Sequence, residues 1–205
     1  MATKDEILTR LLKEENYVSG EELARQTGVS RAAVWKAIKS LKKSGYDIEG
    51  VTKCGYKLKQ NNSLVTAEGV KALLEKDIEV THFDTVDSTN TYCKRLLADG
   101  KQGEFLVTAA KQTAGRGRQG KSFYSPSETG IYFSLVIRPD TSLQNAVTAT
   151  TAAAVAVCKA IEKTTDLKPK IKWVNDVYLN GKKVCGILTE ATTDFESGTV
   201  DSVII

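Results

Sequence analysis

The chain has 205 residues, enough for one large domain or two smaller ones. With 41% apolar and 26% charged residues, it has the composition of a soluble globular protein, which excludes a disordered chain. No apolar run approaches the ~18 residues of a membrane helix, and the acidic start differs from a signal peptide, so we expect a cytoplasmic protein without a membrane partner. The four cysteines are far apart, which favours reduced thiols over a zinc site.

Positive charge is concentrated at the start of the chain. Residues 1–60 hold 12 basic and 8 acidic residues, whereas residues 61–205 hold 17 of each. A basic surface attracts nucleic-acid phosphates, although a charge run alone is more often a solvated helix face. The polar segment 60–63 resembles a linker, so we expect one domain over 1–62 and another over 63–205.

The first domain shows the element order of a winged helix-turn-helix. Apolar periodicity, a Ser19-Gly-Glu-Glu22 capping box, a turn at Gly28 and two short alternating segments mark its elements. The expected elements are, in order, helices over 4–15, 19–27 and 31–44 and strands over 46–48 and 56–58.

The third of these helices would enter the DNA major groove. Its N-terminal side chains would lie nearest the bases, and lysines further along would contact phosphates. The expected DNA-binding residues are Ser30, Arg31, Ala32, Trp35, Lys36, Lys39 and Lys53. A winged helix that binds protein is the alternative, and Trp35 could instead belong to the core.

The second part mixes helices with neighbouring antiparallel strands, which predicts an α+β fold. A polar run at 87–90 can cap a helix, and Asn180-Gly181 is typical of a hairpin turn. The expected helices are 67–75, 87–98 and 144–163, and the expected strands are 78–83, 105–110, 130–137, 177–179 and 184–188.

A glycine-arginine loop follows the second of these strands. Gly115, Gly117 and Gly120 match the spacing of a dinucleotide site, but a strand follows instead of the helix which that site needs. The cations Arg116, Arg118 and Lys121 beside exposed backbone N–H groups favour binding of an anion, above all a phosphate. The alternatives are a mobile surface loop and an RNA-binding arginine-glycine tract, of which the second is weaker because the tract is short and lies between two strands.

Two more polar clusters lie near the Asn180-Gly181 turn. Lys172-Trp-Val-Asn-Asp176 could hold a metal-bound phosphate, or it could be an ordinary turn. Lys183 could point inward and stabilise an anion, or it could face solvent.

Taken in order, these motifs resemble those of the biotin protein ligases. The match comprises Asp87-Ser-Thr-Asn90, the 112–120 loop, Lys172-Trp-Val-Asn-Asp176 and Lys183-Val-Cys-Gly-Ile-Leu188. With a winged helix in front, the chain resembles the bifunctional type that also represses biotin genes. The resemblance implies a class II synthetase-like mixed and antiparallel sheet with flanking helices. The family usually has proline at the position of Val174. Because the chain stops inside the apolar segment 201–205, we expect it to be truncated and to lack the family's small C-terminal β-domain.

The resemblance also implies the chemistry. Biotin and ATP would give biotinyl-5′-adenylate, which is also the corepressor, and the biotin would then pass to a lysine of biotin carboxyl carrier protein. The further partners would be operator DNA and a second copy of the chain in a homodimer. The implied catalytic residues are Arg118 and Lys183, and Asp176 would hold Mg²⁺. The implied biotin-binding residues are Ser88, Thr89, Asn90, Gln112, Gly115, Arg116, Gly117, Arg118, Lys183 and Gly186. The implied ATP-binding and adenylate-binding residues are Arg118, Lys121, Phe123, Lys172, Asn175 and Asp176.

Two other functions remain open at this point. A repressor could sense a ligand without catalysis, and a lipoate-type protein ligase could modify carrier lysines with a different acid. A nucleic-acid enzyme is disfavoured because residues 61–205 carry no net charge.

Overall fold

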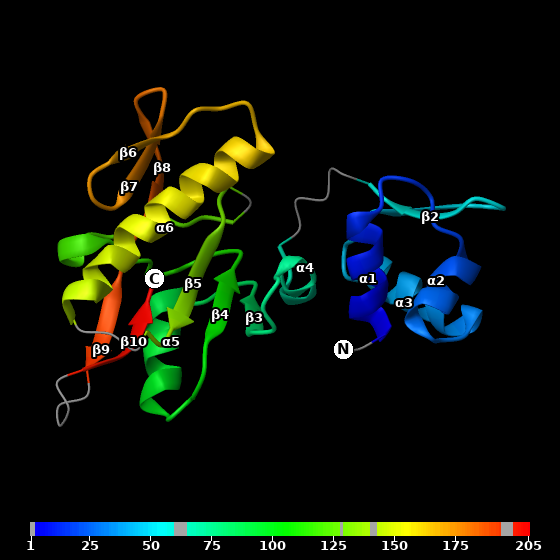
Figure 1. The fold of residues 1–205 in the computed structure, drawn as a ribbon, viewed down its shortest axis with the longest axis horizontal. Coiled ribbons are helices and arrows are strands. Elements are labelled where there is room, and N and C mark those ends of the chain that lie inside the picture. Colours follow the sequence, from blue (N-terminus) through cyan, green and yellow to red (C-terminus); the bar gives the residue numbers. More distant parts are fainter. Residues whose placement is uncertain (1–2, 60–64, 128, 140–142, 194–198) are drawn as a thin grey trace. The chain divides into compact units, whose positions relative to one another are not determined.

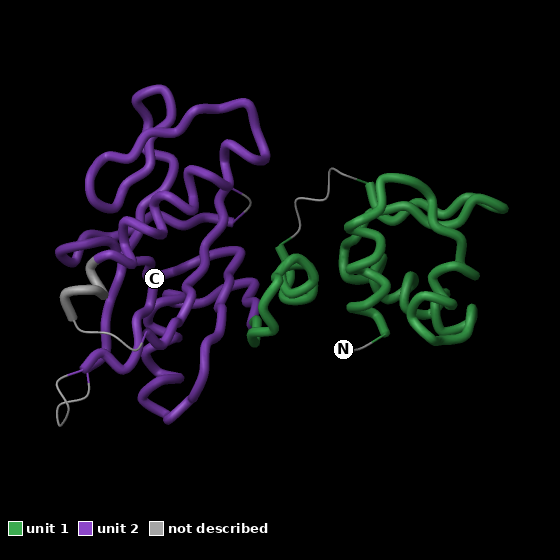
Figure 2. Tube along the Cα trace, viewed as in Figure 1, with its two compact units in different colours: residues 1–80 green, residues 81–205 purple. Residues whose placement is uncertain are grey.

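The computed structural model describes residues 3–59, 65–127, 129–139, 143–193 and 199–205. They form two compact units, Met1–Val80 and Thr81–Ile205 (Figure 2). This division falls after Val80; the polar segment 60–63, where we expect the domain boundary, lies outside the described residues. In the described residues, no helix combines the length and the apolar character that crossing a membrane requires.

Three helices and a hairpin build most of the first unit (Figure 1). The elements are α1 (Thr3–Lys13), α2 (Gly20–Thr27), α3 (Arg31–Lys43), β1 (Ile48–Val51) and β2 (Gly55–Leu58). Their apolar stripes meet in one core that includes Ile7, Leu8, Leu11, Leu23, Val34 and Leu41. The expected winged helix-turn-helix is therefore confirmed.

Local signals explain where these elements begin and end. The Ser19 hydroxyl accepts from the Glu22 amide at 3.0 Å, and Ser30 accepts from the Ala33 amide at 3.2 Å, so each caps a helix. Gly28 ends α2 with a φ of 67°, which a residue with a side chain rarely adopts. The first strand of the hairpin starts at Ile48, later than expected, while Tyr46 is buried in the core.

Helix α4 (Ala67–Leu73) packs on α1 within the first unit. Thr66 caps it by accepting from the Gly69 amide at 3.0 Å and also hydrogen-bonds the Tyr46 hydroxyl. Lys4 of α1 forms an ion pair with Glu68 at 3.1 Å. These contacts are the reason why residues 65–80 group with the winged helix.

A five-stranded sheet dominates the second unit, in the order β3-β4-β5-β10-β9. The strands are β3 (Glu79–Phe83), β4 (Phe105–Ala109), β5 (Tyr132–Ile137), β9 (Glu190–Thr193) and β10 (Val200–Ile204). The pairs β4·β5, β5·β10 and β10·β9 are antiparallel, as an α+β fold requires.

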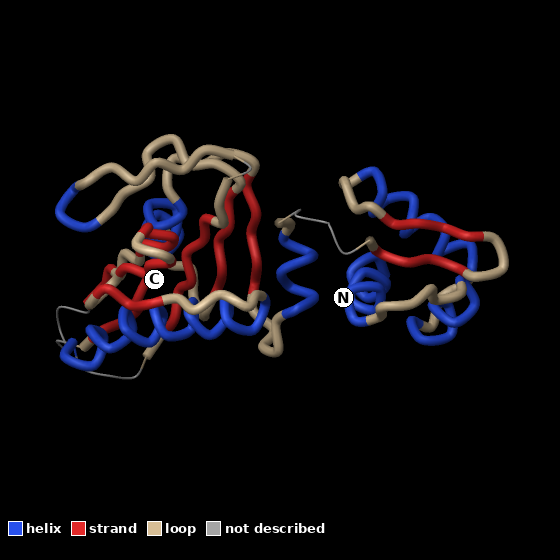
Figure 3. The backbone as a smooth tube through the Cα atoms, turned by 90° about the horizontal axis from the view of Figure 1, so that it is seen from above, coloured by secondary structure: helices blue, strands red, loops and turns tan. Residues whose placement is uncertain are grey.

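The two long helices of this unit cover opposite faces of the sheet. Ile204 packs with Cys93 of α5 (Thr89–Ala98), while the adjacent Val203 packs with Ala149 of α6 (Leu143–Thr164). Adjacent strand residues point to opposite faces, so α5 and α6 lie on either side (Figure 3).

A smaller antiparallel sheet lies under α6. It comprises β6 (Lys170–Lys172), β7 (Asp176–Leu179) and β8 (Lys182–Gly186), and Val177 packs with Ala154 of the helix. Asn180 and Gly181 join β7 to β8 with φ values of 49° and 78°, which confirms the predicted turn.

Candidate functional site

A polar cradle lies at the N-terminus of α5. Ser88, Thr89 and Asn90 are buried there. The Ser88 hydroxyl accepts from the Thr91 amide at 3.4 Å, so this serine caps the helix and fixes where its neighbours point.

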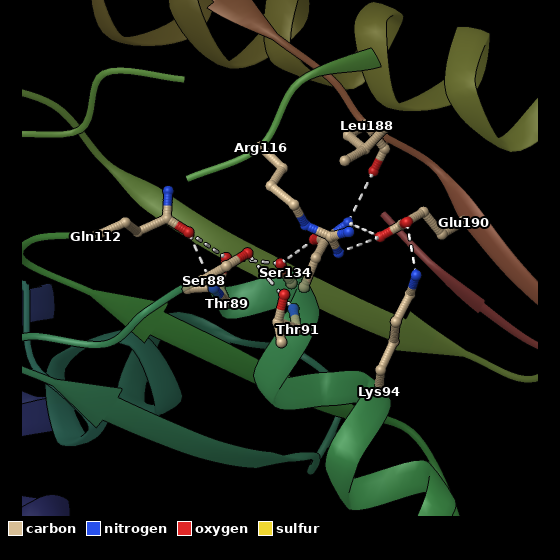
Figure 4. A network of polar contacts seen from close by, with 10 residues as sticks. Ser88, Thr89, Thr91, Lys94, Gln112, Arg116, Ser134, Leu188 and Glu190 are labelled. Carbon is tan, nitrogen blue, oxygen red and sulfur yellow. Dashed lines mark hydrogen bonds and ion pairs between the residues drawn. The ribbon is translucent and has the colours of Figure 1, made fainter. Parts of the chain in front are cut away.

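The side chain of Gln112 closes one side of the cradle. Its Oε1 accepts from both the amide and the hydroxyl of Thr89, at 2.9 and 3.1 Å, and its Nε2 donates to Ser125 at 3.0 Å. Ser134 of β5 completes the group, because its hydroxyl oxygen lies 2.8 Å from the Thr89 hydroxyl and also within hydrogen-bond distance of the Asn90 side chain (Figure 4). Buried donors and acceptors so arranged suit a polar, uncharged part of a ligand.

The glycine-arginine loop forms an irregular hairpin above this cradle. Isolated bridges pair Gln112 with Ser125 and Arg116 with Ser122, and the Phe123 amide donates to the Gly115 carbonyl at 2.8 Å. The tip is a 3₁₀ turn, η1 (Arg118–Gly120). As predicted, the next element is a strand, which excludes the dinucleotide-binding arrangement.

The side chain of Arg116 extends from the loop toward the carboxylate of Glu190 on β9. Its guanidinium lies 3.4 Å from Glu190, which also pairs with Lys94 at 2.6 Å and accepts from Asn90 at 3.0 Å. Burial opposes ionisation of Glu190, but the lysine, the asparagine and the arginine together hold its pKa below the ordinary value of 4.5. The glutamate is therefore charged at neutral pH.

A second cluster forms where β7 begins. Arg118 donates to the Asn175 side chain at 3.0 Å, and Asn175 donates to Asp176 at 3.0 Å. Lys183 of β8 reaches the same carboxylate at 2.7 Å. Its side chain is 41% exposed, so it is paired and half-buried rather than turned fully inward.

The side chains of Phe123 and Lys183 both border Gly186. A Cβ added to Gly186 would lie 3.4 Å from the Phe123 ring and 2.9 Å from the Lys183 ammonium, so only glycine leaves room for both. Asn90 donates to the Leu188 carbonyl at 3.3 Å, and the Ile187 amide donates to Asn175 at 2.9 Å. Segment 186–190 thus borders both clusters.

Three of the predicted site residues make no described side-chain contact with these clusters. Lys121 is exposed, and its described hydrogen bonds are backbone contacts within the loop, as are those of Gly117. Lys172 pairs with Asp176 through the backbone, but its side chain is exposed and its ammonium lies 5.6 Å from the ring centroid of Tyr178. The peptide bond between Trp173 and Val174 is cis.

The predicted DNA-binding residues lie on α3, at its N-terminal cap and on the hairpin, and each is exposed. Arg31, Ala32, Lys36 and Lys39 are exposed, and Lys53 lies at the hairpin tip with a φ of 70°. Trp35 is 55% exposed and lies under the Lys39 ammonium at 5.2 Å, so it does not belong to the core.

Sequence reasoning missed four members of the site, namely Lys94, Ser125, Ser134 and Glu190. Ser134 interrupts an apolar strand, so it is a polar residue where burial is expected. Lys94, Ser125 and Glu190 carry no comparable signal.

Comparisons with known proteins find one family model for each of two parts of the chain. A model of the biotin/lipoate A/B protein ligase family matches residues 82–205. A model of a helix-turn-helix domain matches residues 3–57.

Individual relatives cover most of the chain. It is 38% identical over 192 residues to the bifunctional ligase/repressor BirA of Bacillus spizizenii, which covers 92% of this chain and 58% of that protein. It is 32% identical over 185 residues to BirA of Escherichia coli, and this match covers 90% of this chain and 57% of that protein. The solved biotin protein ligase from Aquifex aeolicus in complex with biotin and ATP has a TM-score of 0.48 and 30% identity, covering 61% of this chain and 50% of that one. The chain thus spans less than two thirds of these relatives.

Proposed function

The chain belongs to the biotin/lipoate A/B protein ligase family, and we propose that it is a biotin protein ligase that uses ATP and also binds DNA as a repressor of biotin genes. The relatives are named bifunctional ligase/repressor. This chain matches both a ligase family model and a helix-turn-helix model.

One observation supports the ligase most. The loop cation Arg118 is hydrogen-bonded to Asn175, which contacts the Asp176–Lys183 pair, while the loop cation Arg116 borders the uncharged cradle. Adenylation must hold two anions together, a carboxylate and the α-phosphate of ATP. Cations placed beside a polar pocket lower the cost of that encounter.

In the first step, a carboxylate oxygen of biotin attacks the α-phosphorus of ATP. The bond from that phosphorus to the bridging oxygen breaks, and pyrophosphate leaves with the electron pair. In the second step, the acceptor lysine amine attacks the acyl carbon, AMP leaves, and the amine gives its proton to water. Neither step needs a protein nucleophile.

The cradle residues Ser88, Thr89, Asn90 and Gln112 would bind the polar ring of biotin, with Gly115 and Gly117 shaping the loop over it. Arg116, Arg118 and Lys183 would take the carboxylate and the α-phosphate, and Gly186 would leave room beside them. Phe123, which borders Gly186, would pack against adenine. Lys121, Lys172, Asn175 and Asp176 would contact the nucleotide.

Mg²⁺ would be held jointly by the protein and the nucleotide. The described residues contain no group of three or more His, Cys, Asp or Glu that could hold a metal. Asp176 supplies one carboxylate, and magnesium at nucleotides commonly combines one or two carboxylates with phosphate oxygens. The residues therefore fit a metal that arrives with ATP and neutralises phosphate charge.

Further partners follow from this function. The acceptor would be a lysine of biotin carboxyl carrier protein, and the corepressor would be biotinyl-5′-adenylate. The exposed face of α3 would contact operator DNA, and the active repressor would be a cytoplasmic homodimer. The free cysteines agree with a reducing compartment.

The test is biotin-dependent exchange of pyrophosphate into MgATP. Lys183→Gln should reduce the exchange by about 10²–10³-fold, the usual loss when a donor to transition-state charge is removed. Lys182→Gln, its neighbour on β8, should leave the rate unchanged. If the unaltered chain shows no exchange with biotin, the ligase proposal fails.

The same assay separates the two alternatives. Exchange with lipoate instead of biotin would indicate a lipoate ligase. Binding of biotin without exchange would indicate a sensor that lacks catalysis.

A further inference from the structure

Glu190 stands where the sheet, helix α5 and the glycine-arginine loop meet. It is the first residue of the edge strand β9 and pairs with Ile204 of the neighbouring strand β10, so the sheet fixes its backbone. Its carboxylate contacts three side chains from other elements, namely Asn90, Lys94 and Arg116 (Figure 4).

The contacts divide between the two carboxylate oxygens. Oε1 takes the Lys94 ammonium at 2.6 Å, while Oε2 takes the Asn90 amide at 3.0 Å and the Arg116 guanidinium at 3.4 Å. Two cations therefore share one negative charge. Because the lysine contact is the shorter, the arginine keeps positive charge available for a further anion.

The contact also leaves donors on Arg116. A guanidinium has five N–H donors, and only the terminal nitrogen NH2 is engaged with Glu190 in the described contact. The loop is also held by backbone pairing at its base, between Gln112 and Ser125 and between Arg116 and Ser122, and by the Arg118 hydrogen bond to Asn175 near its tip. The Glu190 contact is the side-chain link from the loop to the five-stranded sheet.

We propose that Glu190 is the positioning residue for Arg116, tethering the glycine-arginine loop to the sheet and setting the guanidinium beside the cradle. Glu190 itself touches no substrate; it acts through the arginine. The inference rests on the proposed function for what Arg116 then binds, the carboxylate of biotin and the phosphate next to it. A purely structural role, in which Glu190 only holds α5 to the sheet through Asn90 and Lys94, is the competing explanation.

The first test needs no ligand. Trypsin cuts after Arg118 in the loop, so the rate of cleavage between Arg118 and Gln119 reports how often the loop opens. Glu190→Gln should raise this rate about two- to fivefold, as expected for loss of a half-exposed ion pair. Asp201→Asn is the matched control: it removes a carboxylate of β10 that pairs with Arg138 at 2.5 Å and lies outside the loop. The control should leave the rate unchanged.

The second test asks whether Glu190 works through Arg116. In biotin-dependent pyrophosphate exchange, Glu190→Gln should raise the KM for biotin by a similar factor. The same change in an Arg116→Gln background should add nothing, because the two residues form one unit. The proposal is overturned if Glu190→Gln matches Asp201→Asn in proteolysis, or if its effect on KM is undiminished without Arg116. A chain without any exchange would defeat the proposed function, while the proteolysis result would still decide the tether.

Discussion

Gly115 occupies a position where a side chain has no room. A Cβ there would lie 2.5 Å from the Phe123 carbonyl oxygen and 2.8 Å from the Ser125 hydroxyl, closer than real contacts allow. The glycine thus lets the two sides of the loop approach each other beside Gln112.

Gly115→Ala should weaken biotin binding. Relieving the clash costs about 1–3 kcal/mol, or roughly 5- to 150-fold in the dissociation constant measured by calorimetry. Gly117→Ala should cost less, because its nearest contact would be 3.4 Å. Equal losses for the two variants would contradict this account of the loop.

The cysteines provide a test of burial. Cys93 of α5 is fully buried, and desolvation raises the pKa of its thiol to about 12, whereas Cys54 is exposed. At neutral pH the thiolate fraction of Cys93 is then about 10³ lower than that of an ordinary cysteine. Maleimide labelling followed by peptide mapping should find Cys54 modified first. Equal labelling of the two in the folded chain would show that the α5 core is open.

At the scale of elements, the prediction of DNA binding depends on the exposed surface of α3. Charge reversal by Lys36→Glu with Lys39→Glu should lower DNA affinity about tenfold or more, and the slope of log affinity against log salt should fall by ~0.9 for each phosphate that the variant no longer neutralises. Lys13→Glu on α1 makes the same type of charge change on another helix and should leave the affinity unchanged. A gel-shift series measures both variants beside the unaltered chain. Full DNA affinity in the double variant would contradict DNA binding by α3 and would favour the alternative, in which this surface binds protein.

The elements that sequence reasoning found are those with local signals. Each of these signals lies within a few residues of the chain, as in the helix caps at Ser19, Ser30 and Thr66 and the Asn180-Gly181 turn. Apolar periodicity and capping were therefore sufficient to place these elements. The apolar segment at the end of the chain forms β10, as expected.

Strands β6 and β9 were not predicted, and the reason is physical. The three residues of β6 are exposed, and β9 begins with a glutamate that is stabilised by Lys94, Asn90 and Arg116. The three side chains that stabilise this glutamate lie far from it along the chain, so no local pattern reveals the strand. For the same reason the motifs predicted the loop and the hairpin, but not the carboxylate between them.

At the scale of the whole molecule, the two units have separate cores, one built from α1–α3 and the other from the sheet with α5 and α6. The chain thus combines a winged helix-turn-helix with the fold of the biotin/lipoate A/B protein ligase family. Under the proposed function, biotinyl-5′-adenylate binds one unit and changes what the other does.

Biotin with MgATP should therefore raise the affinity for operator DNA. Coupling of two sites typically changes affinity 5- to 150-fold. Fluorescence anisotropy of labelled DNA, with and without both compounds, measures the change, and Lys183→Gln should abolish it. Unchanged affinity for DNA would contradict the coupling between the two sites, but it would not contradict the ligase proposal.

The central claim, that this site joins biotin to adenylate, has one direct test. The chain is incubated with biotin and MgATP, passed through a desalting column and examined by native mass spectrometry. The account predicts a protein species heavier by the mass of biotinyl-5′-adenylate, which appears only when both compounds are present. Recovery of the bare chain, or of chain with biotin alone, would contradict it.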